Sequence, residues 1–123
     1  MKFIPFLAAA SGGALGSVLR YSVSLIPFKG NFPVATLIAN LLGALLIGFI
    51  AGFTDSKTSG KNIVLFFKTG MCGGFTTFST FSLESFEFLK SGKMFLGTAY
   101  ILLSVAGCLL GVWAGMSIGK HFE

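Results

Sequence analysis

The sequence predicts an all-α integral membrane protein with four transmembrane helices, of which the third is broken. Hydrophobic residues make up 54% of the chain and charged residues 11%, whereas about a quarter of the residues of a soluble domain are charged. Four apolar stretches, each long enough to cross a bilayer as a helix, are joined by short polar linkers. One four-helix transmembrane domain therefore takes up residues 1–123, with spans at about residues 3–26, 32–53, 62–89 and 94–118.

The first stretch, residues 3–26, begins like a signal peptide, with a basic residue before an apolar run and small residues. However, Pro5 interrupts a short apolar core, and the apolar character continues past Ser11. We therefore interpret the stretch as a span. It also contains small residues that let another helix approach closely, namely Gly12, Gly13 and Gly16.

Arg20 lies in the last third of this stretch. One interpretation is that its side chain reaches along the helix to the membrane interface. The other is that it places a cation at the mouth of an anion pathway, because a charge inside a membrane usually marks a site. The permanent charge of a guanidinium suits an anion better than a proton.

The second stretch, residues 32–53, carries no charge and one strongly polar residue, Asn40. Thr36 lies four positions earlier and therefore on the same helix face. An asparagine near the middle of a membrane either hydrogen-bonds to another helix or lines a pathway. The sequence leaves both interpretations open for Asn40.

The third stretch, residues 62–89, contains the segment around which we expect the protein to be organised, KTGMCGGFTTFSTFSLE from Lys68 to Glu84. The glycines and threonines at its centre have low helix propensity, which disfavours a continuous helix. A break in a helix inside lipid leaves N–H and C=O groups without partners. Such a break is tolerated only when protein, water or an ion binds these groups. Because half-helix ends at such breaks point at bound ions, we interpret the segment as an ion site.

Beyond the break, phenylalanines recur every three residues and alternate with hydroxyl side chains. The phenylalanines are Phe75, Phe78 and Phe81, and the hydroxyls belong to Thr76, Thr77, Ser79, Thr80 and Ser82. An aromatic stripe at helical spacing is typical of a packed core. Five hydroxyls within seven residues of a lipid-embedded helix need partners, however, and a narrow, wet pathway would supply them.

Two carboxylates, Glu84 and Glu87, follow one helical turn apart. We expect Glu87 to lie at the membrane interface. Glu84 lies deeper and toward the same membrane side as Arg20, so it could form an ion pair with Arg20.

The fourth stretch, residues 94–118, predicts tight association with another helix. Small residues recur every four positions along one face, at Gly107, Gly111, Gly115 and Gly119. Tyr100 and Ser104, also four apart, place two hydroxyls on another face.

Lysine and arginine are almost evenly divided between the two sides of a four-span arrangement. One side has Lys2, Lys57, Lys61, Lys68 and Lys120, and the other has Arg20, Lys29, Lys90 and Lys93. Orientation follows the Lys/Arg bias between short loops, so five against four predicts insertion in both orientations. Two oppositely oriented copies would pair as an inverted repeat with central sites at their interface. Four short helices enclose little interior, which also favours an oligomer.

Several function classes are disfavoured by composition. The net charge is +5, but the basic residues are scattered, which argues against a nucleic-acid partner. Cys72 and Cys108 lack the spacing of a metal site and are interpreted as small buried residues. His121, the one histidine, is expected to be exposed near the end of the chain.

These residues resemble a known family. The run GMCGGFTTFSTFSLE, with GGALGSVLRY and TLIANLLGALLIG before it, is similar to the Fluc (CrcB) fluoride channels of bacteria over essentially the whole chain. The resemblance implies a multi-pass inner-membrane protein that forms an antiparallel, dual-topology homodimer. It further implies two pores through which fluoride leaves the cell passively. The implied partners are fluoride, a second copy of the chain and membrane lipid.

The resemblance also implies roles for individual residues. The pore residues would be Asn40, Phe78, Phe81, Ser79, Thr80, Tyr100 and Ser104. The vestibule residues would be Arg20 and Glu84, and a structural sodium ion would be held by the backbone carbonyls of Gly73 and Thr76 from both subunits. No organic cofactor is implied. The chemistry agrees, because aromatic edges, hydroxyls and an amide can stabilise an anion in several weak steps, while carbonyl oxygens suit a hard cation.

Three other functions fit the sequence less well. A small dual-topology multidrug exporter needs a carboxylate inside the membrane for proton coupling, and the first, second and fourth stretches contain none. A non-transporting membrane scaffold would explain the glycine ladders but not the hydroxyl-rich third stretch. An enzyme is disfavoured, because the sequence offers no nucleophile–histidine set, paired catalytic carboxylates or metal ligands.

Overall fold

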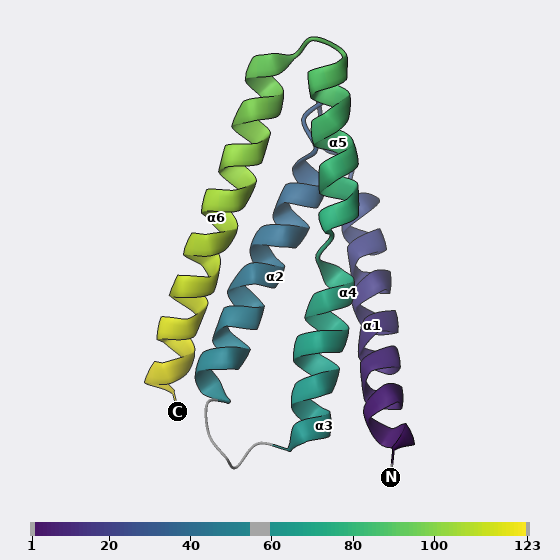
Figure 1. The fold of residues 1–123 in the computed structure, drawn as a ribbon, viewed down its shortest axis with the longest axis vertical. Coiled ribbons are helices and arrows are strands. Elements are labelled where there is room, and N and C mark those ends of the chain that lie inside the picture. Colours follow the sequence, from purple (N-terminus) through teal and green to yellow (C-terminus); the bar gives the residue numbers. More distant parts are fainter. Residues whose placement is uncertain (1, 55–59, 123) are drawn as a thin grey trace.

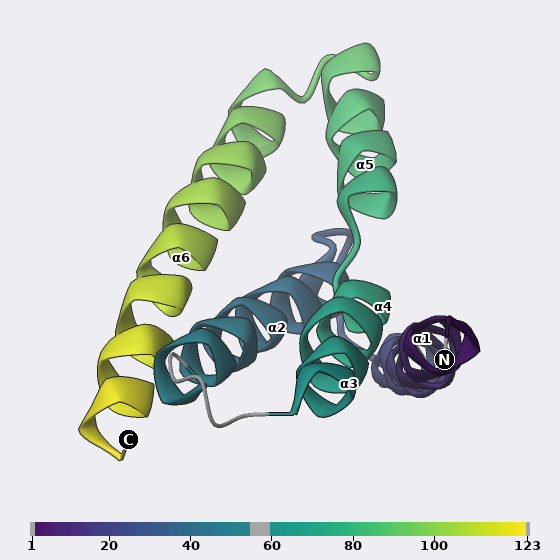
Figure 2. The same cartoon turned by 60° about the horizontal axis from the view of Figure 1, so that its bottom comes forward.

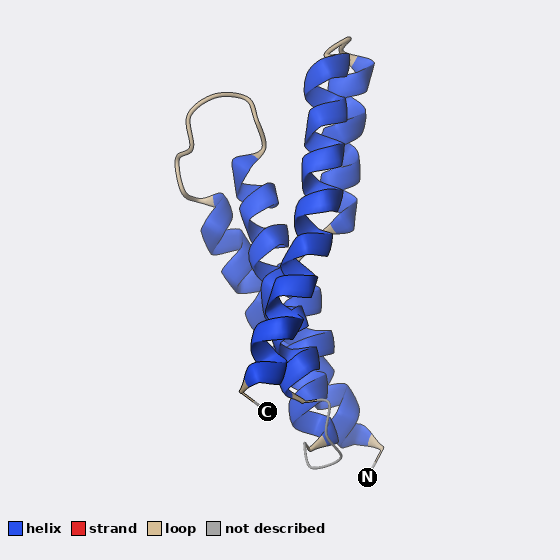
Figure 3. Cartoon of the chain, turned by 90° about the vertical axis from the view of Figure 1, so that its left-hand side faces the viewer, coloured by secondary structure: helices blue, strands red, loops and turns tan. Residues whose placement is uncertain are grey.

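The computed structural model describes residues 2–54 and 60–122, and the regular elements within them are all helical (Figures 1 and 3). Three helices are long: α1 (Phe3–Ser24), α2 (Val34–Phe53) and α6 (Met94–His121). Between α2 and α6 lie α3 (Lys61–Val64), the π-helix η1 (Leu65–Cys72), α4 (Gly73–Phe75) and α5 (Phe78–Lys90). The predicted all-helical class is confirmed.

Three of these helices, α1, α2 and α6, are long and apolar enough to cross a membrane. Prolines lie near two of their ends. Helix α1 stops at Ser24, shortly before Pro27, and proline disfavours helix in the residue before it. Pro33 is the N-cap residue of α2, where its missing amide hydrogen costs no helical hydrogen bond. The predicted linker at residues 54–60, including Lys57, lies mostly outside the described residues.

The third apolar stretch does not form one continuous α-helix. Helical conformation continues from α3 through η1 and α4 to Phe75, and resumes with α5 at Phe78. Between them, Thr76 and Thr77 are extended, with ψ of 160° and 121°. That residues 62–89 as a whole cross the membrane stays a prediction.

Glycines bring α2 and α6 into backbone contact, as the four-residue spacing of the last stretch predicts. A side chain on Gly115 would collide with the carbonyl of Leu45, and one on Gly119 with that of Phe49. The contact is reciprocal, because Gly48 and Gly52 meet backbone atoms of α6 in the same way. Such small residues allow close van der Waals packing of helices in lipid.

A second close contact joins α1 to η1. Gly12 meets the carbonyl of Phe66, and Gly16 meets that of Met71. The interruption after α4 is therefore held beside α1 on one side and α2 on the other (Figure 2).

The helices α5 and α6 form an antiparallel hairpin whose turn lies at one end of the molecule, and the start of α1 and the end of α6 lie at the opposite end (Figure 1). The hairpin turn requires Gly92, whose φ of +83° is rarely adopted by other residues. Large apolar side chains such as Phe95 and Trp113 point outward, with 84% and 70% of their surface exposed. Such surfaces are expected to face lipid or another chain.

Candidate functional site

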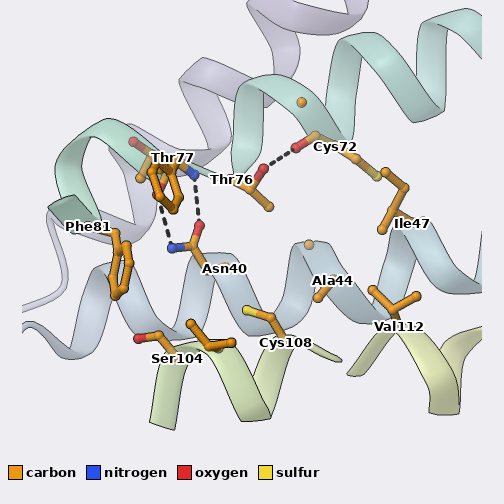
Figure 4. A pocket seen from close by; sticks show the side chains of 14 residues that line it. Asn40, Ala44, Ile47, Cys72, Thr76, Thr77, Phe81, Ser104, Cys108 and Val112 are labelled. Carbon is orange, nitrogen blue, oxygen red and sulfur yellow. Dashed lines mark hydrogen bonds between the residues drawn. The ribbon is translucent and has the colours of Figure 1, made fainter. Parts of the chain in front are cut away.

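The interruption between α4 and α5 is pinned by Asn40 of α2. Its Oδ1 accepts a hydrogen bond from the Thr77 amide at 2.7 Å, and its Nδ2 donates to the Thr77 carbonyl at 3.1 Å (Figure 4). Thr77 in turn caps α5, because its hydroxyl accepts from the Thr80 amide at 3.1 Å. Asn40 therefore hydrogen-bonds to the segment between two helices, and its role in lining a pathway stays a prediction. Asn40 also lines the cavity described below.

The end of α4 leaves carbonyl groups that need partners. The Cys72 carbonyl accepts from both the amide and the hydroxyl of Thr76, each at 3.0 Å, and the Gly74 carbonyl accepts from Arg20 Nε at 3.3 Å. The carbonyls of Gly73 and Thr76 receive none of these bonds. Gly73 is exposed, and a side chain there would meet open space. Carbonyl oxygens that accept none of these hydrogen bonds among the described residues suit a hard cation.

A cavity of about 320 Å³ opens beside the interruption (Figure 4). Its wall comes from α2, the η1–α4 segment, α5 and α6, and most of it is apolar, as at Ile47 and Val112. The polar side chains in the wall are Asn40, Thr76, Thr77 and Ser104. The two cysteines, Cys72 and Cys108, also line this cavity. Cys72 is buried as predicted, whereas Cys108 is only partly buried.

Ser104 is the exceptional member of this wall. Only 4% of its surface is exposed, and its hydroxyl has no hydrogen-bond partner among the described residues. An unpartnered hydroxyl away from water is costly, so such groups normally find a partner. The hydroxyl is thus available to a guest in the cavity.

Two phenylalanines of α5 stand at the edge of the cavity. The ring centroids of Phe78 and Phe81 are 5.7 Å apart, with the planes inclined by 50°. Phe81 is buried against Tyr100, whereas 78% of Phe78 is exposed. Phe81 therefore belongs to the core of this chain, and Phe78 projects from it.

Glu84 lies beyond these rings, in a cluster of hydroxyls. Tyr100 donates to its Oε1 at 2.9 Å, and Thr36 of α2 donates to its Oε2 at 3.1 Å. Tyr100 is fully buried. Thr36 was not predicted as a site residue, although its place one turn before Asn40 on the same helix face is the signal that identifies it.

The expected ion pair between Arg20 and Glu84 is wrong. Arg20 bonds to the Gly74 carbonyl, and Glu84 bonds to two hydroxyls. The two carboxylate oxygens are already satisfied by Thr36 and Tyr100, and the guanidinium is turned toward the end of α4. Arg20 and Glu84 therefore do not form an ion pair, although the sequence places both toward the same membrane side.

Ser79 and Thr80 lie at the start of α5, outside the cavity wall. Ser79 is exposed, and its hydroxyl is 3.3 Å from that of Thr77. Thr80 is half-buried and bonded through its amide to Thr77. Among the residues that the structure describes, no group of three or more His, Cys, Asp or Glu side chains is arranged to hold a metal.

The sequence is similar to a known protein family and to proteins of several bacteria. A family model described as CrcB-like protein, Camphor Resistance (CrcB), matches residues 7–116. A fluoride-specific ion channel FluC from Clostridium perfringens (strain 13 / Type A) is 47% identical over 123 residues, which cover 97% of this chain and 96% of that protein. A fluoride-specific ion channel FluC from Flavobacterium psychrophilum is 42% identical, covering 98% of this chain and 99% of that protein.

Proposed function

The chain belongs to the CrcB family, as the family model and the bacterial relatives show, and from this premise we propose that it is a fluoride-selective channel. It is a multi-pass protein of the bacterial inner membrane. Fluoride passes through it down its own gradient and leaves the cell. No reaction is catalysed, so the residues of the site act by binding and by exclusion.

The observation that carries this proposal is the buried, unpartnered hydroxyl of Ser104 in a cavity edged by Phe78 and Phe81. A small anion inside a membrane needs donors to replace its hydration shell. The Ser104 hydroxyl is one such donor, and the aromatic edges carry partial positive charge. Larger anions such as chloride are less strongly hydrated than fluoride, so they would be excluded by the small size of the pathway and not by the apolar remainder of its wall.

The pathway that we propose continues past Tyr100. Tyr100 lies one helical turn from Ser104 on α6, and its hydroxyl points at Glu84 together with that of Thr36. Each of these hydroxyls donates its one proton to Glu84 in this structure, so an anion that moves on from Ser104 would be stabilised here only when the hydroxyls turn from the carboxylate to the ion. Several weak contacts in series permit passage, whereas one strong site would trap the ion. Ser79 and Thr80 are part of this proposal at the start of α5, and Asn40 contributes by holding Thr77 at the cavity.

Arg20 and Glu84 are proposed as vestibule residues at the approaches to this pathway. Arg20 places a permanent positive charge beside the interruption through its bond to the Gly74 carbonyl. That charge offsets the negative end of the α4 dipole and favours an approaching anion.

We also propose that a structural sodium ion is held at the interruption. The carbonyl oxygens of Gly73 and Thr76, from each of two subunits, would bind it. Their chemistry fits, because both carbonyls are free of the hydrogen bonds that occupy the carbonyls of Cys72, Gly74 and Thr77. A fixed cation here would offset the repulsion that carbonyl oxygens exert on an anion.

The working unit of the proposal is an antiparallel homodimer of dual topology with two pores. Support comes from the exposed ring of Phe78, from the cavity that one chain leaves open beside α4, and from the balanced Lys/Arg distribution. A second, inverted copy would close each cavity and line each pore with residues of both subunits.

The test is a side-by-side measurement of fluoride and chloride efflux from liposomes that contain the purified protein. We expect rapid fluoride efflux and no chloride efflux above that of protein-free liposomes. Equal efflux of both anions would reject selectivity, and efflux of neither would reject the channel.

A further inference from the structure

Helix α6 turns one stripe of side chains toward the cavity beside the interruption. Ser104, Cys108 and Val112 follow each other at four-residue spacing, which places them on one face of the helix. All three belong to the cavity wall (Figure 4). Cys108 therefore adds a thiol to this wall, one helical turn from the Ser104 hydroxyl.

Ser104 indicates that this part of the cavity receives a guest. Only 4% of its surface is exposed, and its hydroxyl has no hydrogen-bond partner among the described residues. Such a buried group normally finds a partner, and a guest that reaches it through the cavity supplies one. The Cβ atoms of helical residues four positions apart are about 5–6 Å from each other. A guest at Ser104 therefore lies beside Cys108.

The two cysteines of the cavity wall differ in their exposure. Both thiols are free, and Cys72 reaches the wall from η1 whereas Cys108 reaches it from α6. Only 1% of the surface of Cys72 is exposed, while Cys108 is partly exposed. In the proposed dimer this cavity becomes the fluoride pathway, so Cys108 stays open to what enters it. A guest in the cavity therefore finds the sulfur of Cys108 more accessible than that of Cys72.

A thiol in a mostly apolar wall suits a soft metal ion. Sulfur ligands select soft metals, and the thiol loses its proton when the metal binds. Mercury(II) is soft and is satisfied by two ligands in a line, so one thiolate and one chloride suffice. As mercuric chloride it is a neutral molecule, which an apolar wall admits more readily than a free cation. A sulfur–mercury bond forms and one mercury–chlorine bond breaks, while the thiol proton and a chloride ion leave.

We propose that Cys108 is a binding site for a soft, thiophilic metal ion, and that a metal held there blocks the passage of fluoride. This inhibitory site rests on the proposed channel function, because the block is a block of fluoride efflux. The metal and its chloride stand one helical turn from Ser104, in a cavity of about 320 Å³. They occupy the space through which the anion reaches the Ser104 hydroxyl.

The experiment measures fluoride efflux from liposomes that contain the purified protein, before mercuric chloride is added, after it, and after an excess of dithiothreitol. The parent, Cys108→Ala and the matched control Cys72→Ala are each compared with their own untreated efflux, and protein-free liposomes report any leak. We expect mercuric chloride to reduce the parent's efflux to that of protein-free liposomes and dithiothreitol to restore it. Cys108→Ala should keep its untreated efflux, whereas Cys72→Ala should be inhibited like the parent. Intact-protein mass spectrometry of the treated, folded protein should find one mercury per chain in the parent and none in Cys108→Ala.

Three results would overturn the metal site: inhibition of Cys108→Ala as strong as that of the parent, no mercury on the folded parent protein, or full efflux from a parent protein that carries the mercury. The mass measurement depends neither on transport nor on the folding of Cys72→Ala. Failure of the channel proposal is recognised separately, because the untreated parent would then release no fluoride while mercury still bound to Cys108.

Discussion

The Oδ1 and Nδ2 atoms of Asn40 bind the backbone amide and carbonyl of one residue, Thr77. These backbone groups lie in the extended segment between α4 and α5, where no helical partner is available. Leaving such a buried group without a partner costs about 1–3 kcal/mol. The asparagine of α2 therefore holds the interruption in its place beside the cavity.

We predict that Asn40→Asp abolishes fluoride efflux. An ionised carboxylate only accepts hydrogen bonds, so it keeps the Thr77 amide but loses the Thr77 carbonyl and places a negative charge in the cavity wall. The stability of the folded protein should fall by about 1–3 kcal/mol, measured by denaturation in detergent alongside the efflux assay. Asn62→Asp, at an exposed position in α3, is the matched control and should retain efflux. An Asn40→Asp protein that transports like the parent would contradict the assignment.

The sequence predicted the helical class and the packing because both follow from local patterns. The glycines at four-residue spacing in α6 were expected to meet another helix, and Gly115 and Gly119 meet α2. The partner of a polar side chain is not local. Asn40 bonds to Thr77 because the backbone groups of Thr77 lie in the interruption, outside any helix.

The failed pairing of Arg20 with Glu84 has a similar cause. The sequence places both charges toward one membrane side but does not reveal that Thr36 and Tyr100 already satisfy the carboxylate. Nor does it reveal that α1 packs so closely on η1, through Gly16, that the arginine reaches the end of α4. Side-chain partners across helices therefore required the three-dimensional arrangement.

The proposed dual topology leads to a prediction about insertion. Reporters fused to the chain terminus should show both orientations in comparable amounts, because the Lys/Arg count is balanced. Two or three lysines added to the loops of one side should fix the orientation, and this variant expressed alone should not transport. If the parent chain inserted in a single orientation, the proposed antiparallel dimer would be wrong.

The proposed sodium site predicts a dependence on the buffer cation. When sodium is replaced by a large organic cation, the dimer should lose stability or activity, since the carbonyls of Gly73 and Thr76 would then face each other without a cation between them. Size-exclusion chromatography and efflux after long dialysis measure the two effects. Potassium in place of sodium serves as a control for ionic strength. Unchanged dimer and efflux after exhaustive exchange would contradict an exchangeable sodium ion.

Substitution of Phe78 and Phe81 distinguishes a role in the fluoride pathway from a role in packing alone. Phe78→Ile and Phe81→Ile keep apolar bulk but remove the positive ring edge. Because similar-sized apolar exchanges usually cost less than about 1.5 kcal/mol, both proteins should fold and assemble. Fluoride efflux should fall steeply in each. Efflux at the parent rate from both variants would show that the two rings serve packing alone.

Ser104 allows the sharpest test, because its hydroxyl has no partner in the chain. If the hydroxyl served the fold, Ser104→Ala would destabilise the protein. Since it makes no hydrogen bond, we expect Ser104→Ala to leave the free energy of unfolding unchanged or slightly raised. Efflux of fluoride should fall about tenfold or more, because a hydrogen bond to a charged group contributes about 1.5–3 kcal/mol and 1.4 kcal/mol corresponds to a factor of ten.

Ser85 provides the control for this substitution. It is also buried, but its hydroxyl donates to the Phe81 carbonyl within α5 at 2.8 Å, and it is not part of the cavity wall. Ser85→Ala therefore removes a hydroxyl that is already satisfied and should leave fluoride efflux close to that of the parent. The same assay on both variants distinguishes a donor to the ion from a general loss of buried hydroxyls. If Ser104→Ala and Ser85→Ala reduced efflux equally, Ser104 would have no special place in the pathway.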